Sequence, residues 1–197
     1  MSRVEYRIAT VDDAAAIADV YAPYVRDTVI SFETEAPDAA ELARRIERIG
    51  SQYPWLAASS DGRIVGYAYA CENRSRRAYR WSVDTAVYLD ESAQRRGIGR
   101  ELYRRLFALL RAQGYVNAFA GITLPNVASV GLHESMGFAL IGVYRRVGYK
   151  LGAWHDVGWW QLVIADGSGE PEEPVRLGDL DRVLVERVLA GAGGTVG

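Results

Sequence analysis

A short polar turn carries the residues best suited to holding an anion. It reads Gln94-Arg95-Arg96-Gly97-Ile98-Gly99 and leads from an apolar stretch into an amphipathic one. Two glycines let a ligand approach the backbone, and a helix that begins here offers free N–H groups and a positive dipole end. Arg95 and Arg96 add full charges. The turn therefore predicts a phosphate or pyrophosphate site, and the alternative is a glycine pair that serves only packing. The spacing fits neither a Walker A loop nor a dinucleotide fingerprint.

Two further side chains could move a proton. Asp84 lies in the mostly apolar stretch 81–89, where a carboxylate is costly unless it is paired or functional. His133 follows Asn126 by about two helical turns, so both would share one helix face. Alternatives stay open for each: Asp84 could pair with a nearby arginine, and His133 could be a core histidine bonded to a backbone carbonyl.

A basic loop, Asn73-Arg74-Ser75-Arg76-Arg77, directly precedes the Asp84 stretch. Guanidinium groups bind carboxylates and similar oxyanions through two parallel hydrogen bonds. We therefore expect Arg74, together with Arg77, to contact an anionic group of a substrate, and Tyr79 to add a hydroxyl donor or a wall. The alternative is a solvated basic loop.

The hydrophobic pattern alternates between strand and helix periods, which indicates an α/β domain. Asp38 with Glu41 predicts a helix start, and Asp61-Gly62 predicts a hairpin turn. Strands are expected over residues 5–8, 55–59, 64–70, 81–89, 116–122, 138–146 and 157–164, and helices over 11–24, 38–50, 99–113 and 126–135. In the 99–113 helix the leucines should face inward, and the arginines expected outside are Arg100, Arg104, Arg105 and Arg111.

The composition excludes several classes of protein. A length of 197 residues fits one domain with a tail, and a net charge of -2 argues against a dedicated nucleic-acid binder. One cysteine, Cys71, excludes an internal disulfide, and two histidines with one cysteine make a structural zinc site unfavourable, so no metal is expected. No secretory signal or membrane-length apolar run is seen, so the expected compartment is the cytoplasm. All basic residues except Lys150 are arginines.

The composition changes at Asp166. Residues 166–174 are rich in glycine, proline and acids, which is typical of a linker. We therefore place one domain at residues 1–165 and a linker with a C-terminal tail at 166–197. A weakly ordered tail is the favoured interpretation, and the alternative is a packing or association helix over residues 176–190.

The polar turn matches the Gln/Arg-x-x-Gly-x-Gly/Ala signature of the GNAT N-acetyltransferase superfamily, and residues 124–138 resemble its second signature. Other segments resemble the phosphinothricin and methionine sulfoximine N-acetyltransferase group of that superfamily. They are Tyr53-Pro54-Trp55-Leu56, Ala78-Tyr79-Arg80-Trp81, Leu132-His133-Glu134 and residues 154–162. The resemblance extends over residues 4–164 and ends before the linker.

The resemblance implies a GNAT-type fold: a mixed, mostly antiparallel sheet of about seven strands, helices on both faces, and a splayed central strand pair. It also implies acetyl-CoA as co-substrate, with a strand pairing to its pantetheine arm and the polar turn binding its pyrophosphate. The residues so assigned are Val87, Tyr88, Leu89, Gln94, Arg95, Arg96, Gly97, Ile98, Gly99, Asn126 and Ser135.

The implied reaction is direct acetyl transfer to the α-amine of a small amino acid such as phosphinothricin, methionine sulfoximine or methionine sulfone. The amine must lose a proton first, and the resemblance assigns its acceptance to Asp84, with His133 near the reaction centre. Close relatives often have Glu at the place of Asp84, so the shorter side chain favours a water relay. The implied substrate contacts are Phe32, Arg74, Arg77 and Tyr79.

The resemblance also implies a homodimer. Two rival functions remain: an N-acetyltransferase for a different small amine or a protein N-terminus, and an acyl-CoA-binding module without turnover.

Overall fold

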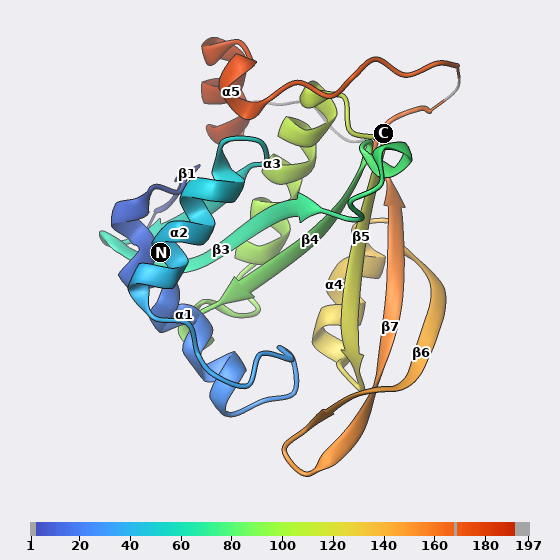
Figure 1. Ribbon diagram of the computed structural model, residues 1–197. Helices are drawn as coiled ribbons and strands as arrows, with labels where there is room; N and C mark the ends of the chain where they lie inside the picture. The colour runs from blue at the N-terminus through green and yellow to red at the C-terminus, as the bar shows by residue number, and fades with distance from the viewer. Residues whose placement is uncertain (1–2, 168, 192–197) are drawn as a thin grey trace.

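A seven-stranded sheet forms the centre of the computed structural model, which describes residues 3–167 and 169–191 (Figure 1). Its strand order is β1-β2-β3-β4-β5-β7-β6, and β4–β5 is the parallel pair between antiparallel neighbours. The predicted mixed, mostly antiparallel α/β fold is confirmed. The strands are β1 (Val4–Ile8), β2 (Trp55–Ser60), β3 (Arg63–Glu72), β4 (Ser82–Leu89), β5 (Asn117–Leu124), β6 (Ala139–Lys150) and β7 (Ala153–Val163).

Helices cover both faces of the sheet because its central strands bury side chains on both sides. Trp55 and Ala57 of β2 pack toward α1 (Ala14–Arg26) and α2 (Ala39–Gly50). Leu56 and Ala58 belong to the core on the opposite face, which α3 (Ile98–Gln113) covers together with partly buried residues of α4 (Val127–Ser135). Because successive side chains of a strand point to opposite faces, the one sheet contributes to a hydrophobic core on each side.

The central strands β4 and β5 separate after a short paired stretch. Their register runs over Ser82↔Asn117, Val83↔Ala118 and Asp84↔Phe119, whereas β4 continues to Leu89 and β5 to Leu124. The splay predicted for a central strand pair is therefore present, and it begins at Asp84.

Local sequence signals produce the expected boundaries. The Asp38 carboxylate accepts a hydrogen bond of 2.8 Å from the Glu41 N–H at the start of α2. Asp61 and Gly62 have φ values of 51° and 77°, as a tight hairpin turn requires. β6 and β7 extend further than expected, because they form one long hairpin that turns at Leu151-Gly152.

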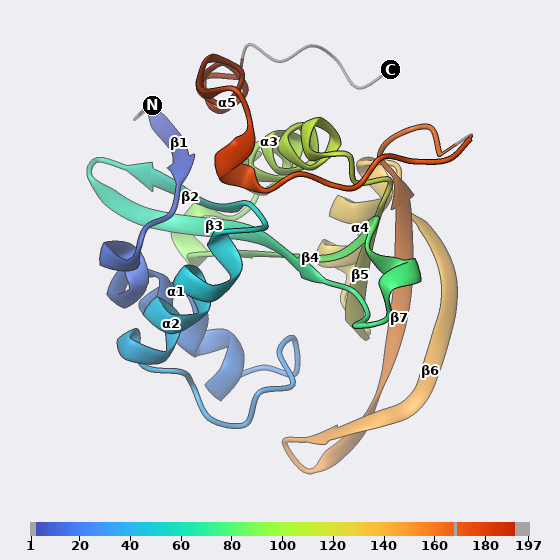
Figure 2. The same ribbon diagram turned by 45° about the horizontal axis from the view of Figure 1, so that its top comes forward.

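The segment after the linker packs on the domain (Figure 2). A short turn, Leu177–Asp179, and α5 (Arg182–Leu189) lie over α3, and Leu177 and Val188 join the core. For these residues the structure has the packing helix of the alternative interpretation and differs from the weakly ordered tail. Residues 192–197 of the expected tail lie outside the described residues. The helical pattern predicts Arg105 on the surface, but α5 covers it, so its side chain is buried and its Nε donates to the Leu189 carbonyl at 2.9 Å.

Replacing a buried α5 side chain tests this docking. Val188→Ala should lower the free energy of unfolding by about 1–2 kcal/mol, because Val188 is 6% exposed. The matched control is Val183→Ala on the same helix, where the side chain is 62% exposed and the change should be small. Thermal unfolding should show a Tm about 2–8 °C lower for Val188→Ala alone. Equal Tm values for the two variants would mean that α5 is not docked.

Within the described residues, no helix is both long enough and apolar enough to cross a membrane.

Candidate active site

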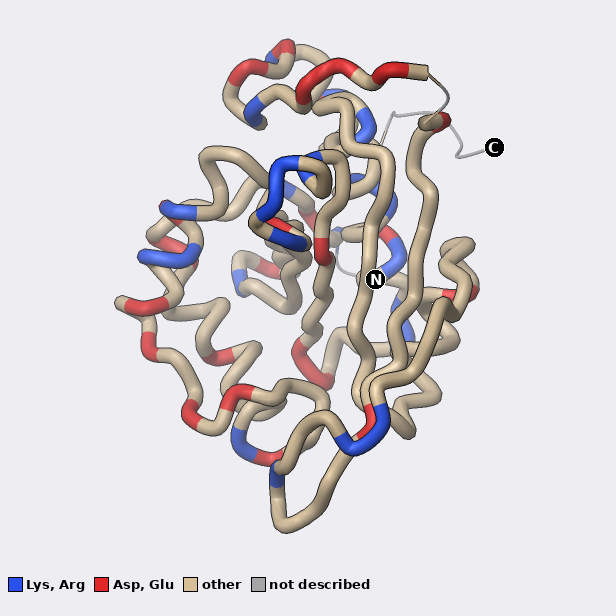
Figure 3. Tube along the Cα trace, turned by 45° about the vertical axis from the view of Figure 1, so that its right-hand side comes forward, with Lys and Arg blue, Asp and Glu red and all other residues tan. Residues whose placement is uncertain are grey.

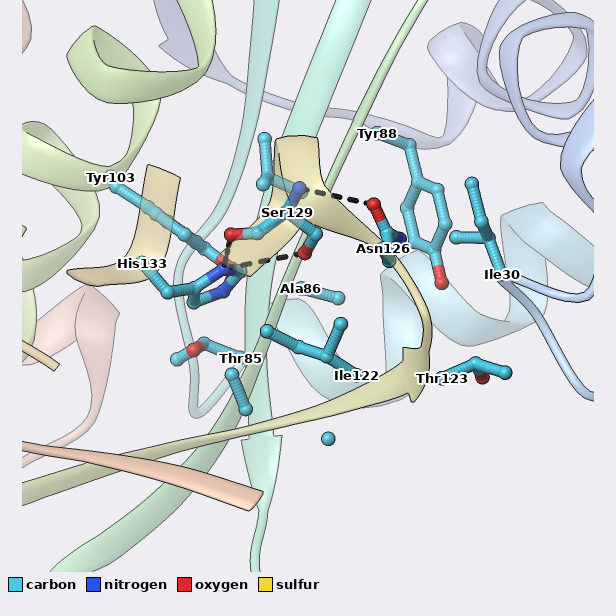
Figure 4. A pocket seen from close by; sticks show the side chains of 13 residues that line it. Ile30, Thr85, Ala86, Tyr88, Tyr103, Ile122, Thr123, Asn126, Ser129 and His133 are labelled. Carbon is cyan, nitrogen blue, oxygen red and sulfur yellow. Dashed lines mark hydrogen bonds between the residues drawn. The ribbon is translucent and has the colours of Figure 1, made fainter. Parts of the chain in front are cut away.

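A cavity of about 50 Å³ occupies the gap between β4 and β5 (Figure 4). β4 contributes residues 85–88, β5 contributes residues 120–123, and α4 contributes Ser129, His133 and its N-cap residue Asn126. Ile30 and Tyr103 complete its wall. Because the β4–β5 pairing ends at Asp84, the β4 backbone beyond it faces the gap and can pair with an extended ligand, as an added strand would.

The predicted anion-binding turn lies at the far end of this β4 edge. Gly97 has a φ of +80° directly before α3, a conformation that favours glycine. A Cβ on Gly99 would lie 3.4 Å from the side chains of both Leu132 and Leu89, an ordinary contact distance, so the start of α3 packs against β4 and α4. The Gln94 amide donates to the Tyr24 hydroxyl at 3.3 Å, and this hydroxyl donates to the Leu89 carbonyl at 2.5 Å. The turn is thereby fixed to the end of β4.

Asn126 and Ser135 lie at opposite ends of α4. The Asn126 Oδ1 accepts a hydrogen bond of 3.1 Å from the Ser129 N–H, and Asn126 also lines the cavity. The Ser135 hydroxyl donates to the Leu132 carbonyl and accepts from Arg100 at 2.8 Å. It faces a separate groove of about 410 Å³ beside α3, so the structure places it next to the first turn of α3 and outside the small cavity.

Asp84 is half-buried where the two strands part. Burial raises the pKa of its carboxyl to about 6, although a hydrogen bond from Asn73 and the charge of Arg74 both act to lower it. The Asn73 amide donates to Asp84 Oδ1 at 2.6 Å. Among the described residues, no arginine lies within ion-pair distance of this carboxylate, which disfavours the ion-pair alternative. A carboxylate with such a pKa is ionised at neutral pH and can accept a proton.

Cys71 faces Asp84 across the β3–β4 register. Burial, followed by the nearby Asp84 charge, raises the pKa of the Cys71 thiol to about 12. A thiol held in its protonated form is a poor nucleophile, so Cys71 is poorly suited to form a covalent intermediate.

His133 is 4% exposed and uses both ring nitrogens. Nδ1 lies 2.7 Å from the Ser129 carbonyl, which requires that Nδ1 carry the proton and donate it. Nε2 lies 3.0 Å from the Tyr103 hydroxyl and accepts from it in that tautomer. Burial lowers the pKa of His133, so the neutral ring prevails. The backbone bond expected for a core histidine is present, and the same ring borders the cavity (Figure 4).

The expected substrate residues divide into two groups. Arg74 and Tyr79 are exposed near Asp84's strand, and Arg74 influences the Asp84 carboxyl electrostatically. Arg77 instead forms an ion pair of 3.1 Å with Glu173 of the linker. Figure 3 shows the acidic linker and the basic loop in charge colours.

Phe32 is 38% exposed and packs on the β6–β7 hairpin, where a Cβ on Gly148 would lie 2.0 Å from its ring. It is not among the residues that line the small cavity, whereas Ile30, two residues before it, is.

Sequence reasoning missed three residues around the site. Asn73 carried a weak signal, as an amide directly before Arg74. Ile30 and Tyr103 carried no motif, because their positions depend on contacts between distant segments.

Comparison with known proteins identifies the fold. Residues 6–159 match the family model of the acetyltransferase (GNAT) domain. The chain belongs to this acetyltransferase family. Within the described residues, the acetyltransferase holds no group of three or more His, Cys, Asp or Glu side chains placed to bind a metal ion.

Named relatives cover most of the acetyltransferase. It is 42% identical to phosphinothricin N-acetyltransferase of Streptomyces viridochromogenes over 88% of this chain and 93% of that protein. It is 34% identical to the L-methionine sulfoximine/L-methionine sulfone acetyltransferase of Salmonella typhimurium over 80% of this chain and 93% of that protein. A crystal structure of a phosphinothricin acetyltransferase from Sinorhizobium meliloti in complex with acetyl-CoA superimposes with a TM-score of 0.83 at 34% identity, covering 89% and 96% of the two chains.

Proposed function

We propose that this acetyltransferase transfers the acetyl group of acetyl-CoA to the α-amine of a small amino acid such as phosphinothricin, methionine sulfoximine or methionine sulfone. The observation that carries the proposal is the free edge of β4. It joins Asp84, a proton acceptor, to the glycine turn, an anion site, along one strand. The names of the relatives and the acetyl-CoA in a similar structure support the choice of substrates.

The residues present fit acetyl-CoA. Gly97 and Gly99 open the backbone at the start of α3, whose first N–H groups lack intrahelical acceptors. These groups, with Arg95 and Arg96, would hold the pyrophosphate, while the backbone of residues 87–89 would pair with the extended arm. When bound, acetyl-CoA supplies the activated acetyl group as a thioester.

The chain's own residues then accept a proton from the substrate and orient the substrate. Asp84 accepts a proton from the substrate ammonium group, directly or through water, and Asn73 keeps its Oδ1 in place. Arg74 binds the anionic end of the substrate, so the amine points toward the gap between β4 and β5. The neutral amine forms the new C–N bond as the C–S bond breaks, and the second proton lost from the amine nitrogen protonates the departing thiolate.

Release of free thiol tests the proposal. The protein is incubated with acetyl-CoA and, separately, phosphinothricin, methionine sulfoximine or methionine sulfone, and thiol is followed over time. We expect release with at least one of them. Release only with unrelated amines would reassign the substrate, and binding of acetyl-CoA in calorimetry without release with any amine would indicate the non-catalytic module.

We further propose a homodimer formed through β6 and β7. This edge of the sheet exposes large apolar side chains, as an interface does: Leu140, Ile141, Tyr144, Val147, Tyr149, Leu151, Trp154 and Val163. Light scattering should give the mass of a dimer for the native chain, and Trp154→Asp should shift it toward the monomer. A monomeric native chain would refute this assembly.

A further inference from the structure

The chain's one lysine is buried. Lys150 is the last residue of β6 and is 7% exposed. Its ammonium group donates to the backbone carbonyls of Val25 at 2.6 Å and Ser31 at 2.7 Å. Within the described part of the chain, no carboxylate lies within ion-pair distance of it. Because an unsatisfied buried charge is very unfavourable, these two carbonyls are the partners that keep Lys150 in place.

The two carbonyls belong to different parts of the chain. Val25 lies in the last turn of α1, where carbonyls lack intrahelical donors and a cation is favoured. Ser31 lies in the loop between α1 and α2 and is 5% exposed. Its hydroxyl lies 2.7 Å from the Tyr21 hydroxyl of α1. The loop is thus held at Ser31 from two sides, by the hairpin through Lys150 and by α1 through Tyr21.

The two neighbours of Ser31 are exposed, and each contacts a different part of the molecule. Ile30 is 40% exposed and lines the cavity between β4 and β5. Phe32 is 38% exposed and packs on Gly148, two residues before Lys150 in the hairpin. Figure 1 shows the loop after α1 beside the tip of the β6–β7 hairpin. A fixed point at Ser31 therefore sets the positions of the residues on either side of it.

We infer that Lys150 is a positioning residue of the amine-acceptor site: by anchoring Ser31 it holds Ile30 in the wall of the β4–β5 cavity and Phe32 against the β6–β7 hairpin. The inference rests on the proposed function for the identity of the acceptor site. It also accounts for a lysine in a chain that otherwise uses arginine. A compact ammonium group has freely rotating donors that can reach two carbonyls from different segments, whereas a guanidinium group holds its donors in a fixed planar fork.

Two variants of Lys150 and one control test the inference. Lys150→Met keeps most of the side-chain stem and removes the donors, and Lys150→Arg keeps the charge with the wrong shape. For both, we expect the KM of the amino acid to rise about tenfold, with the KM of acetyl-CoA within about twofold of native. Amide hydrogen exchange in residues 27–33 should become faster. The control is Arg145→Met in the same hairpin, whose side chain is 76% exposed, and it should change neither quantity.

The readouts separate the possible failures. Unchanged exchange in residues 27–33, or equal increases in both KM values, would overturn the positioning role. If the native protein acetylates none of the amino acids, the proposed function fails, and hydrogen exchange alone still decides whether Lys150 anchors the loop. If Lys150→Met is not recovered in folded form, Lys150→Arg carries the same test, because it retains the buried cation.

Discussion

Asp84→Asn is expected to lower kcat by about 10²–10⁴-fold, the usual contribution of a general base. The amide keeps the size of the carboxylate and can still accept the hydrogen bond from Asn73, but it cannot take a proton. The KM for acetyl-CoA should change little, because the anion-binding turn lies at the other end of β4. Initial rates of thiol release, with each substrate varied in turn, measure both quantities.

The pH dependence of the native protein provides the second half of this test. The pKa of Asp84 is raised to about 6 by burial, so kcat/KM should rise with pH through this value and level off above it. Asp84→Glu is the matched control, because it restores a carboxylate and should recover part of the rate. A loss below about tenfold in Asp84→Asn would instead favour His133, the other candidate, as the main base.

The elements that could be predicted from sequence are those fixed by local chemistry. Asp38 caps α2, Asp61-Gly62 turns the β2–β3 hairpin, and Gly97 adopts the left-handed backbone that glycine favours. Each depends on a few neighbouring residues, so the pattern alone carries the information. The polar turn that leads into α3 belongs to the same class, and the structure places it at the end of the β4 edge, as expected.

The features that sequence reasoning missed depend on contacts between segments far apart in the chain. Arg105 lies on the expected outer face of α3 and is nevertheless buried, because α5 covers it from 84 residues away in sequence. Lys150 reaches Ser31 from 119 residues away, and periodicity gives no sign of that contact. Arg77 has an exposed loop position that suits a substrate contact, yet Glu173 of the linker is its ion-pair partner. Such pairings follow from the folded chain, so a single sequence does not display them.

Asp84→Asn, which is expected to lower kcat, should raise the stability of the folded protein. The folded-state pKa of Asp84 is raised from 3.8 to about 6, so the folded state holds this proton at pH values where the unfolded chain has released it. The native protein therefore loses stability as pH rises from about 4 to about 6, by up to about 3 kcal/mol for a shift of two pKa units. Above that range the ionised carboxylate remains a constant cost of holding a charge in a half-buried position.

Asp84→Asn removes this cost because the amide never ionises. At pH 8 the variant should be more stable than the native protein by about 1–3 kcal/mol, which corresponds to a Tm higher by about 2–12 °C. At pH 4, where the native carboxyl is largely protonated, the two Tm values should nearly coincide. Thermal unfolding at both pH values measures the difference. A native protein as stable as the variant at pH 8 would show that the carboxylate is well solvated, and Asp84 would then lack the raised pKa that suits it to take a proton from an amine.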